Sequence, residues 1–528
     1  AEMPKDSLGI LYPGADTVYK TGTIRSFKTP EKGSGLLAYL LEKPQADTSS
    51  GNLVIVSLHK QQQDTIKNVQ DYVISKTGSY LLVELVADKK DSTTRDALLR
   101  WDVAARKADT LSRGFGNRTQ LAFDDAGKQA AWVNTRDSAK ALQQFYELYY
   151  FSAGQDTGSI VADKNTKAFP DGWSVSQHGK VWFSRNGARL FFGSAPIPPA
   201  KDTNIVDFEV AKVDVWNYLD DYLQPMQLKN LEKDQQKNYL AAYFPGNKKV
   251  LQLADKDVDN VVVADEGNSD YAIAYTDKGQ RVALQWTGGT LKTSYLLRIT
   301  DASRKLIIKD LDSTSYISPD GKYVIWYDLN QKHYFTYETA TGTTRNISAN
   351  IPVQVYDEED QPETPGNYGI AAWLEKDAAV YIYDRYDIWK VDPSGRQAPV
   401  MITGGVGRQQ HLVFRYVKLS KDERFLKAGQ QLVLQTFNEI TKENGYYTTE
   451  STKSNLKPVV MGPYNYTKLL KAEAANYYLY SKENYQQSPD VYGGNDIPHA
   501  VQLSHLNPQQ AEYNWGTASL FKWTAYNG

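Results

Sequence analysis

The chain contains no cysteine and only four methionines among its 528 residues. Without cysteine it can form no disulfide, bind no metal through thiolates and use no thiolate nucleophile. The sparse methionine also argues against a helical bundle. A cysteine-free composition is compatible with export from the cell.

Excess charge of one sign and long apolar runs are also lacking. Sixty basic residues stand against 62 acidic ones, which gives a net charge of −2. No electrostatic footprint for nucleic acid or for an anionic membrane is therefore present, and no apolar run reaches the length of a transmembrane helix. The histidines and carboxylates show no zinc or calcium spacing, so the sequence predicts no metal and no cofactor.

Aromatic residues, in contrast, are abundant, with 37 tyrosines and 11 tryptophans. The most informative stretch, residues 318–328, reads Ser-Pro-Asp-Gly-Lys-Tyr-Val-Ile-Trp-Tyr-Asp. Pro319 and Gly321 favour a tight turn, and the β-branched and aromatic residues that follow favour a strand. Further short runs at 334–338 and 345–347 complete a four-stranded antiparallel sheet of the kind found in β-propeller blades.

Degenerate copies of this turn and strand recur along the chain. The copies lie at residues 75–83, 123–132, 184–192, 276–283, 373–395 and 419–425. Their spacing runs from about 40 to more than 60 residues, in or just above the range for propeller blades. One such unit cannot bury its own faces, so the repeat predicts closure into a ring. We expect an all-β fold, a seven- or eight-bladed β-propeller of four-stranded antiparallel blades over residues 21–505.

Two segments interrupt the β pattern. Residues 214–240 form an excursion, and the helix-favouring composition of 228–240 predicts a short helix. Residues 355–369 carry five acidic groups and two prolines, which predicts a long loop of the kind that usually has a function. At the ends, residues 1–20 read as a linker. Residues 521–526 read as a strand that runs into an Asn-Gly turn.

Several motifs resemble the propeller of prolyl oligopeptidase-family (S9) serine peptidases. Tyr-Gly-Ile-Ala at 368–371 with Trp373, followed by Tyr-Asp-Arg-Tyr-Asp-Ile-Trp at 383–389, is similar to the exported, dipeptidyl-peptidase-like members from Bacteroidetes-type bacteria. Residues 483–492 resemble the last blade of that family, and residues 502–509 resemble its crossing into the hydrolase domain. Residues 522–528 resemble the first hydrolase strand. The resemblance covers essentially the whole chain.

The resemblance implies a substrate-gating propeller for oligopeptides, joined to an α/β-hydrolase domain that these residues lack. Residues 506–528 are then the crossing segment into that missing domain. The chain has no Gly-x-Ser-x-Gly elbow, so we predict no catalytic residue in it and no activity by itself, while the parent protein is expected to be a serine peptidase. The resemblance further implies export, to the periplasm or the outer membrane of a Gram-negative bacterium. The expected partners are a peptide substrate, the chain's own hydrolase domain and, in a dimer, a second copy.

In the dipeptidyl-peptidase branch of this family, acidic propeller residues bind the free amine of the substrate. An ammonium group needs one or two carboxylates beside it for charge-assisted hydrogen bonds. Two acidic pairs are the candidates here, Asp220 with Asp221 in the excursion and Glu358 with Glu359 in the acidic loop. The plainer interpretation, which we favour, is that both are solvated loop charges.

An Asp-x-Trp pattern occurs twice, at Asp214-Val215-Trp216 and at Asp387-Ile388-Trp389. In propellers this pattern usually marks a strand with a packed tryptophan and a turn-capping aspartate. We therefore expect both tryptophans to be core residues rather than ligand-binding groups.

Two other functions remain open at this point. A stand-alone periplasmic or cell-surface binding propeller, with a protein or glycan partner, would carry the same repeated turn. A carbohydrate-active propeller would need a dedicated pair of carboxylates, which sequence cannot reveal. The Asn-Pro-Gln segment at 507–509 favours the peptidase.

Overall fold

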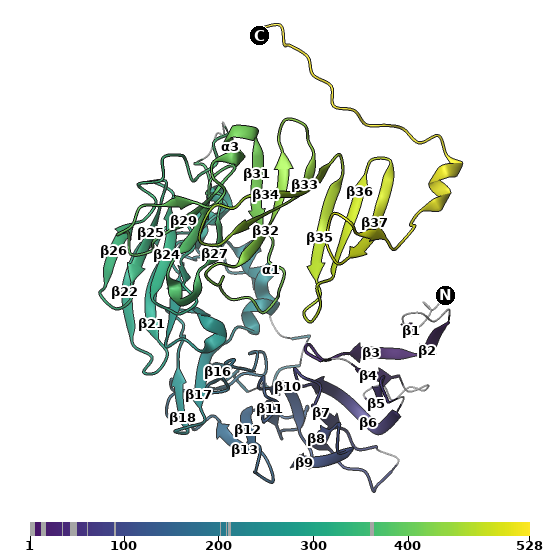
Figure 1. Cartoon of the computed structure of the whole chain (residues 1–528). Helices are drawn as coiled ribbons and strands as arrows, with labels where there is room; N and C mark the ends of the chain where they lie inside the picture. Colours follow the sequence, from purple (N-terminus) through teal and green to yellow (C-terminus); the bar gives the residue numbers. More distant parts are fainter. Residues whose placement is uncertain are drawn as a thin grey trace. The chain divides into compact units, whose positions relative to one another are not determined.

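The computed structural model of the chain describes residues 6–11, 17–33, 35–42, 50–60, 62–88, 91–200, 202–206, 208–209, 213–359 and 364–528. In these residues the strands form nine sheets, one of two strands, one of seven, one of five and six of four (Figure 1). In nearly all of them the strand order follows the chain, as in a meander. The expected all-β class with four-stranded antiparallel sheets is confirmed.

The first half of the chain holds the irregular sheets. The two-stranded sheet is β1 (Ser7–Leu11) and β2 (Val18–Gly22), and the seven-stranded sheet is β3 (Ile24–Lys28), β4 (Leu36–Leu41), β5 (Gly51–Ser57), β6 (Gln62–Ile74), β7 (Tyr80–Leu85), β8 (Ala97–Asp102) and β9 (Lys107–Arg113). The next four-stranded sheet is β10 (Asn117–Phe123), β11 (Gln129–Thr135), β12 (Glu147–Ser152) and β13 (Ser159–Ala162). The five-stranded sheet is β14 (Trp173–Val175), β15 (Trp182–Phe183), β16 (Leu190–Pro196), β17 (Tyr239–Phe244) and β18 (Lys249–Gln252).

Five four-stranded sheets follow along the chain. They are β19 (Asn260–Val263), β20 (Tyr271–Thr276), β21 (Lys292–Arg298) and β22 (Arg304–Leu311); β23 (Tyr316–Ile317), β24 (Tyr323–Asp328), β25 (His333–Glu338) and β26 (Thr343–Asn346); β27 (Ile370–Trp373), β28 (Val380–Tyr383), β29 (Ile388–Val391) and β30 (Val400–Met401); β31 (Leu412–Tyr416), β32 (Gln431–Asn438), β33 (Asn444–Glu450) and β34 (Lys457–Gly462); β35 (Asn465–Lys471), β36 (Tyr478–Asn484), β37 (Gln487–Gly494) and β38 (Val501–Gln502).

The described helices are few and short. They are α1 (Gln224–Gln235), α2 (Leu284–Thr287) and α3 (Val406–Gln410), with 3-10 turns η1 (Asp265–Gly267), η2 (Arg281–Ala283), η3 (Glu375–Asp377) and η4 (Pro508–Glu512). Within the described ranges, no helix has the length and apolar character needed to cross a bilayer.

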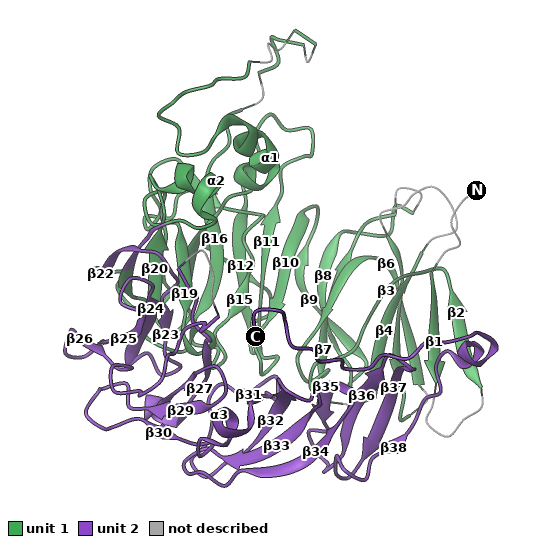
Figure 2. Ribbon diagram, turned by 90° about the horizontal axis from the view of Figure 1, so that it is seen from above, with its two compact units in different colours: residues 1–290, 295–306 green, residues 291–294, 307–528 purple. Residues whose placement is uncertain are grey.

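The chain divides into two compact units (Figure 2). Unit 1 comprises residues 1–290 and 295–306, and unit 2 comprises residues 291–294 and 307–528. Unit 1 contains the excursion with Asp220 and Asp221. Unit 2 contains the acidic loop with Glu358 and Glu359.

The repeated turn predicted from sequence has the same hydrogen bonds at four positions. In the copy at Ser318, the backbone N–H of Ser318 donates to Tyr323 O at 2.8 Å and that of Gly321 donates to Ser318 O at 2.9 Å. The Ser318 hydroxyl accepts from Tyr323 N at 2.9 Å. The turns that begin at Ser75, Asp124 and Ser184 repeat all three contacts, and the glycine of each turn has a positive φ. A buried polar side chain at the first position and a glycine at the fourth thus define the repeat.

Side chains connect these turns from one sheet to the next. In unit 1, Lys76 Nζ lies 2.7 Å from Asp125 Oδ2, and the side chain of Gln129 donates to Gly187 O at 3.0 Å. In unit 2, the Ser318 hydroxyl donates to Asp377 at 2.6 Å. Consecutive sheets therefore meet through their turns as well as through the apolar clusters between their faces, which are rich in tyrosine and tryptophan.

Two expected copies of the turn and strand did not form. After the turn at 276–279 the chain enters η2 and α2 rather than a strand, because Arg281 is bound by carboxylates from neighbouring segments. Residues 419–425 contain a turn but no strand, and β32 begins only at Gln431.

The predicted ends and helix also need correction. Residues 7–11 and 18–20 of the expected linker lie in β1 and β2; residues 1–5 and 12–16 are outside the described ranges. The expected strand at 521–526 is absent, since these residues are exposed and have no strand beside them in the described structure. The helix predicted at 228–240 is α1, which ends at Gln235. The apolar residues from Tyr239 pair with β16 instead, so sheet pairing overrides helix propensity.

Candidate functional site

Glu358 of the acidic loop is held in a two-pronged ion pair. Arg408 Nη1 and Nη2 donate to its two carboxylate oxygens at 3.1 and 2.6 Å. The backbone N–H of Glu358 donates to the hydroxyl of Tyr368 at 2.8 Å. The Glu358 side chain is 19% exposed. This arrangement anchors the loop next to α3, although residues 360–363 of the loop lie outside the described ranges.

Glu359 is more open, with 67% of its side chain exposed. Its carboxylate lies 3.3 Å from Arg385 Nη2. Arg385 is shared with Glu439, whose two oxygens accept from Nη2 at 3.1 Å each. The hydroxyl of Tyr386 also donates to Glu439 at 2.8 Å. Glu359 is therefore the member of this pair that a ligand can reach most easily.

Two buried aspartates position both arginines. Asp384 accepts hydrogen bonds from the backbone N–H groups of Tyr386 and Asp387 and from Trp389 Nε1, at 2.7–2.8 Å. Asp387 accepts from the Thr403 hydroxyl at 2.6 Å and from the N–H groups of Gly407 and Arg408 at the start of α3. The segment between β28 and β29 is thus a rigid turn that presents Arg385 on one side and orients Arg408 through its backbone.

The electrostatics of this cluster follow from those contacts. The hydrogen bond with Glu358 raises the pKa of Arg408. Burial is the largest single influence on the pKa of Arg385 and lowers it, but the hydrogen bond and charge of Glu439, together with Tyr386 and Tyr368, raise the pKa overall. Burial raises the pKa of Asp387, against the hydrogen bond from Thr403. Both arginines therefore remain cations that compete with any ligand ammonium for the glutamates.

In unit 1, Asp221 fastens the base of the excursion. Its carboxylate accepts from the N–H groups of Gly279 and Arg281, both at 2.9 Å, and lies 3.6 Å from Arg281 Nε. Arg281 also binds Asp277 at 2.7 Å and Asp259 at 3.2 Å. Asp221 therefore has a structural task in this unit.

Asp220, next to it, has fewer contacts in the described structure. Its carboxylate accepts one hydrogen bond among the described residues, from the amide of Gln227 at 3.0 Å. No cation neutralises it within that part of the structure. Of the four acidic residues predicted from sequence, Asp220 is the one whose charge is free for an incoming ammonium group.

The excursion itself carries an exposed apolar strip, residues 213–219. Trp216 is 70% exposed and Tyr218 is 93% exposed. The prediction that Trp216 packs in the core is wrong, because this segment is exposed and belongs to none of the described sheets. The matching prediction for Trp389 is confirmed, since it is buried between β28 and β30 and Asp387 caps a turn.

Sequence reasoning named the four acidic residues but missed their partners. Arg385 and Arg408 determine which glutamate is accessible, and Arg281 determines the role of Asp221. Arg385 lies inside the recognised motif at 383–389, so it could have been noticed there. Arg281, Arg408 and Glu439 carry no local signal.

One further pair, in unit 2, joins a serine and a histidine. His333 Nδ1 lies 3.0 Å from Ser348 Oγ, which also accepts from the N–H of Tyr334 at 2.9 Å. Ser348 is buried. The contact closes the turn after β26, and both residues line a cavity of about 350 Å³.

Comparison with known proteins finds no matching family model and no matching curated protein. Among solved structures the chain is similar to Porphyromonas gingivalis dipeptidyl peptidase 4, with 12% identity over 92% of this chain and 60% of that chain, at a TM-score of 0.36. It is also similar to the beta-propeller domain of the Trilobed protease from Pyrococcus furiosus, with 11% identity over 91% and 98% of the two chains and a TM-score of 0.26. A third similar structure is the GH74 enzyme of Niastella koreensis, with 11% identity over 94% and 71% and a TM-score of 0.29.

These similar structures include propellers of peptidases as well as the GH74 enzyme. The chain spans less than two thirds of the length of the dipeptidyl peptidase. Similarity at these identities and TM-scores assigns no activity to the chain.

Proposed function

We propose that the chain is the substrate-gating propeller domain of an exported serine peptidase of the prolyl oligopeptidase family. Its substrates are oligopeptides, and it is catalytically silent alone. The observation that supports this proposal is the motif at 383–389. It folds into a buried turn that carries Arg385 and orients Arg408 of α3 through Asp387, and these arginines hold the acidic loop through Glu359 and Glu358.

In the same proposal, the α/β-hydrolase domain is the chain's principal partner in the full-length protein. The intact mass of the native gene product tests this directly. A product with no hydrolase sequence would overturn the peptidase assignment. Fluorophosphonate labelling of residues 1–528 is expected to be absent, and labelling at any serine would contradict a silent propeller.

Recognition of the substrate amine is assigned to Asp220, with Glu359 as the second candidate. Asp221 and Glu358 then support them, because each is paired with an arginine and their side chains are only 24% and 19% exposed, whereas that of Glu359 is 67% exposed. A free ammonium group beside an unpaired carboxylate gains a charge-assisted hydrogen bond that an acetylated terminus cannot make.

The test compares the tetrapeptide Gly-Pro-Gly-Gly with its N-acetylated form by calorimetry on the whole chain. We expect the free peptide to bind about tenfold more tightly, and Asp220→Asn to abolish the difference. Glu512→Gln, at an exposed site elsewhere, is the control. Equal affinity for the two peptides would exclude amine recognition and leave a gate without end-group preference.

Export to the periplasm or the outer membrane of a Gram-negative bacterium also belongs to this proposal. Cell fractionation of the source organism tests it, and recovery of the full-length protein from the cytoplasm would contradict it. Light scattering measures the molar mass of the purified protein in solution and so tests whether it forms a dimer.

A further inference from the structure

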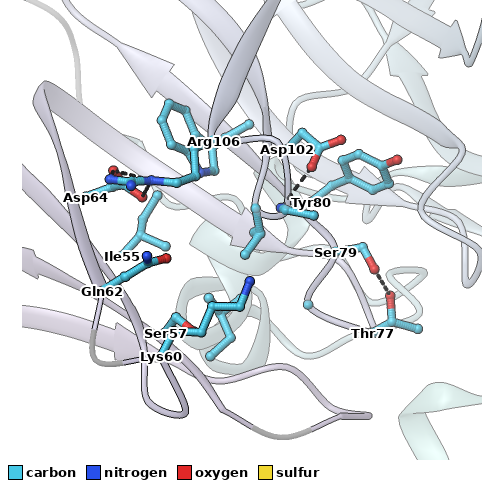
Figure 3. Close-up of a pocket in the computed structure, with 15 residues that line it drawn as sticks. Ile55, Ser57, Lys60, Gln62, Asp64, Thr77, Ser79, Tyr80, Asp102 and Arg106 are labelled. Atoms are coloured by element: carbon cyan, nitrogen blue, oxygen red, sulfur yellow. Dashed lines mark hydrogen bonds and ion pairs between the residues drawn. The ribbon is translucent and has the colours of Figure 1, made fainter.

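A cavity of about 430 Å³ opens in the seven-stranded sheet of unit 1. In this sheet, β6 pairs with β5 through its first half and with β7 through its second, so two meanders share one long strand. One wall of the cavity comes from β4, β5 and the start of β6, and the other from β7, β8 and the turn after β8 (Figure 3). The volume lies in the range of small-molecule sites, about 300–1,000 Å³.

The cavity has an apolar floor. Leu36 and Ile55 are buried members of the cluster that packs the two meanders together, and Trp101 and Val103 pack against that cluster. All four line the cavity. The floor therefore offers aliphatic and aromatic surface to the apolar face of a ligand.

One end of the cavity is closed by an ion pair between the walls. Arg106, in the turn after β8, binds both carboxylate oxygens of Asp64 on β6 (Figure 3). The hydrogen bond with Asp64 raises the pKa of Arg106. These two charges neutralise each other, so neither attracts a ligand ion strongly.

Lys60 is the cation of the site that forms no ion pair with a described residue. It lies in the turn between β5 and β6, and its side chain reaches into the cavity (Figure 3). Its ammonium group has no hydrogen bond or ion pair with any residue that the structure describes. A lysine that lines a cavity without a partner is suited to a carboxylate of a ligand.

Asp102 also lines the cavity, and its carboxylate accepts hydrogen bonds from the backbone N–H groups of Ala104 and Ala105, at 2.9 Å each. The other polar groups are neutral. The hydroxyls of Ser57, Thr77 and Ser79 and the amide of Gln62 line the cavity, and Thr77 Oγ1 lies 2.9 Å from Ser79 Oγ. Hydroxyl and amide groups both donate and accept hydrogen bonds. The ligand that matches them has several groups of the same dual character.

From one free cation, several hydroxyl and amide groups and an apolar floor, we infer that this cavity binds a carboxylated sugar. The carboxylate pairs with Lys60, the sugar hydroxyls bond Ser57, Gln62, Thr77 and Ser79, and the C–H face of the ring packs on Trp101. A peptide end would use Lys60 equally well, but it would leave most of the hydroxyl groups without partners. This site is independent of the acidic pairs assigned to peptide binding.

The experiment titrates D-glucuronic acid and D-glucose separately into the whole chain, followed by calorimetry or ligand-observed NMR. The two sugars differ at C6, where one has a carboxylate and the other a hydroxymethyl group. We expect glucuronate to bind about tenfold more tightly than glucose, and the difference to shrink as salt is raised.

Lys60→Met removes the ammonium and keeps most of the side-chain volume. It should reduce glucuronate affinity about tenfold and leave glucose binding unchanged. Lys60 lies in an exposed turn, so the variant is expected to fold. Lys67→Met, on an exposed part of β6 outside the cavity, is the matched control and should bind like the wild type.

Three results would overturn the inference. The first is the absence of saturable binding for either sugar. The second is equal binding of glucuronate to the wild type and to Lys60→Met. The third is Lys60-dependent binding of the dipeptide Gly-Phe that is tighter than that of glucuronate, which would assign the cavity to a peptide carboxylate.

Discussion

Two segments of the chain share the pattern Asp-x-Trp and have opposite surroundings. In unit 2, Trp389 is 5% exposed, and its indole N–H donates to Asp384 at 2.8 Å. The carboxylate of Asp387 accepts three hydrogen bonds, from the Thr403 hydroxyl and from the N–H groups of Gly407 and Arg408. In unit 1, Trp216 is 70% exposed and belongs to no strand, and Asp214 beside it is also exposed.

The difference comes from what the neighbouring residues pair with. Trp389 follows Tyr-Ile-Tyr at 381–383, which forms the centre of a sheet and places β29 between two strands. Trp216 follows a stretch that pairs with no strand in the described residues. A three-residue pattern therefore indicates a local turn, whereas burial depends on whether the flanking residues enter a sheet.

The largest expected effect is on stability at the two tryptophans. Trp389→Ala should lower the free energy of unfolding by about 3–5 kcal/mol, because it leaves a cavity in the core and removes the donor to Asp384. Trp216→Ala should change it by no more than about 0.5 kcal/mol. Urea unfolding followed by circular dichroism measures both. Similar losses for the two variants would contradict the assigned burial.

The next largest effect is expected on stability at the two aspartates of the pattern, Asp387 and Asp214. Asp387→Ala leaves the Thr403 hydroxyl and the N–H groups of Gly407 and Arg408 without their acceptor, at a cost of about 2–3 kcal/mol. Asp214→Ala should again cost no more than about 0.5 kcal/mol. Thermal unfolding distinguishes them. An unchanged Tm for Asp387→Ala would mean that water replaces the carboxylate at the start of α3.

Much of the fold could be predicted because the repeat is local. Ser318 or its equivalents at the first turn position and a glycine at the fourth specify the same three hydrogen bonds each time. The strand predicted within 276–283 does not form. Arg281 there contacts carboxylates distant in sequence, which a local pattern does not reveal. The helix predicted to run through Tyr239 is likewise wrong at its end, because local sequence does not reveal the pairing of this segment with β16.

The candidate site was predictable only in part for the same reason. Acidic pairs stand out in a sequence, but their availability depends on partners contributed by other elements. Arg408 is 50 residues from Glu358, and Arg281 is 60 residues from Asp221. The cavity beside Lys60 had no sequence signal, since its lining comes from five strands and the turns between them.

A smaller effect concerns the pH dependence of stability. Burial raises the pKa of Asp387 above its ordinary value of 3.8. The folded state therefore binds this proton more tightly than the unfolded state does. Protonated Asp387 therefore contributes to the free energy of unfolding below pH 3.8. This contribution is lost as the pH rises through the pKa of Asp387 in the folded state. Asp387→Asn should have a flatter profile of Tm against pH across this window than the wild type. If Tm fell equally steeply with pH in both proteins, the pH dependence of stability would come from other buried acids.

The smallest effect is optical and tests the exposed member of the pair. Trp216 is one of 11 tryptophans, so its removal changes only a minor share of the fluorescence. Because Trp216 is exposed and Trp389 is buried, Trp216→Phe should reduce the acrylamide-quenchable fraction, and Trp389→Phe should reduce the protected fraction. Trp286, which is 75% exposed and lies in α2, provides the matched control, since Trp286→Phe should resemble Trp216→Phe. If Trp216→Phe instead reduced the protected fraction, the strip at 213–219 would be covered in solution, and its exposure could not explain the contrast with Trp389.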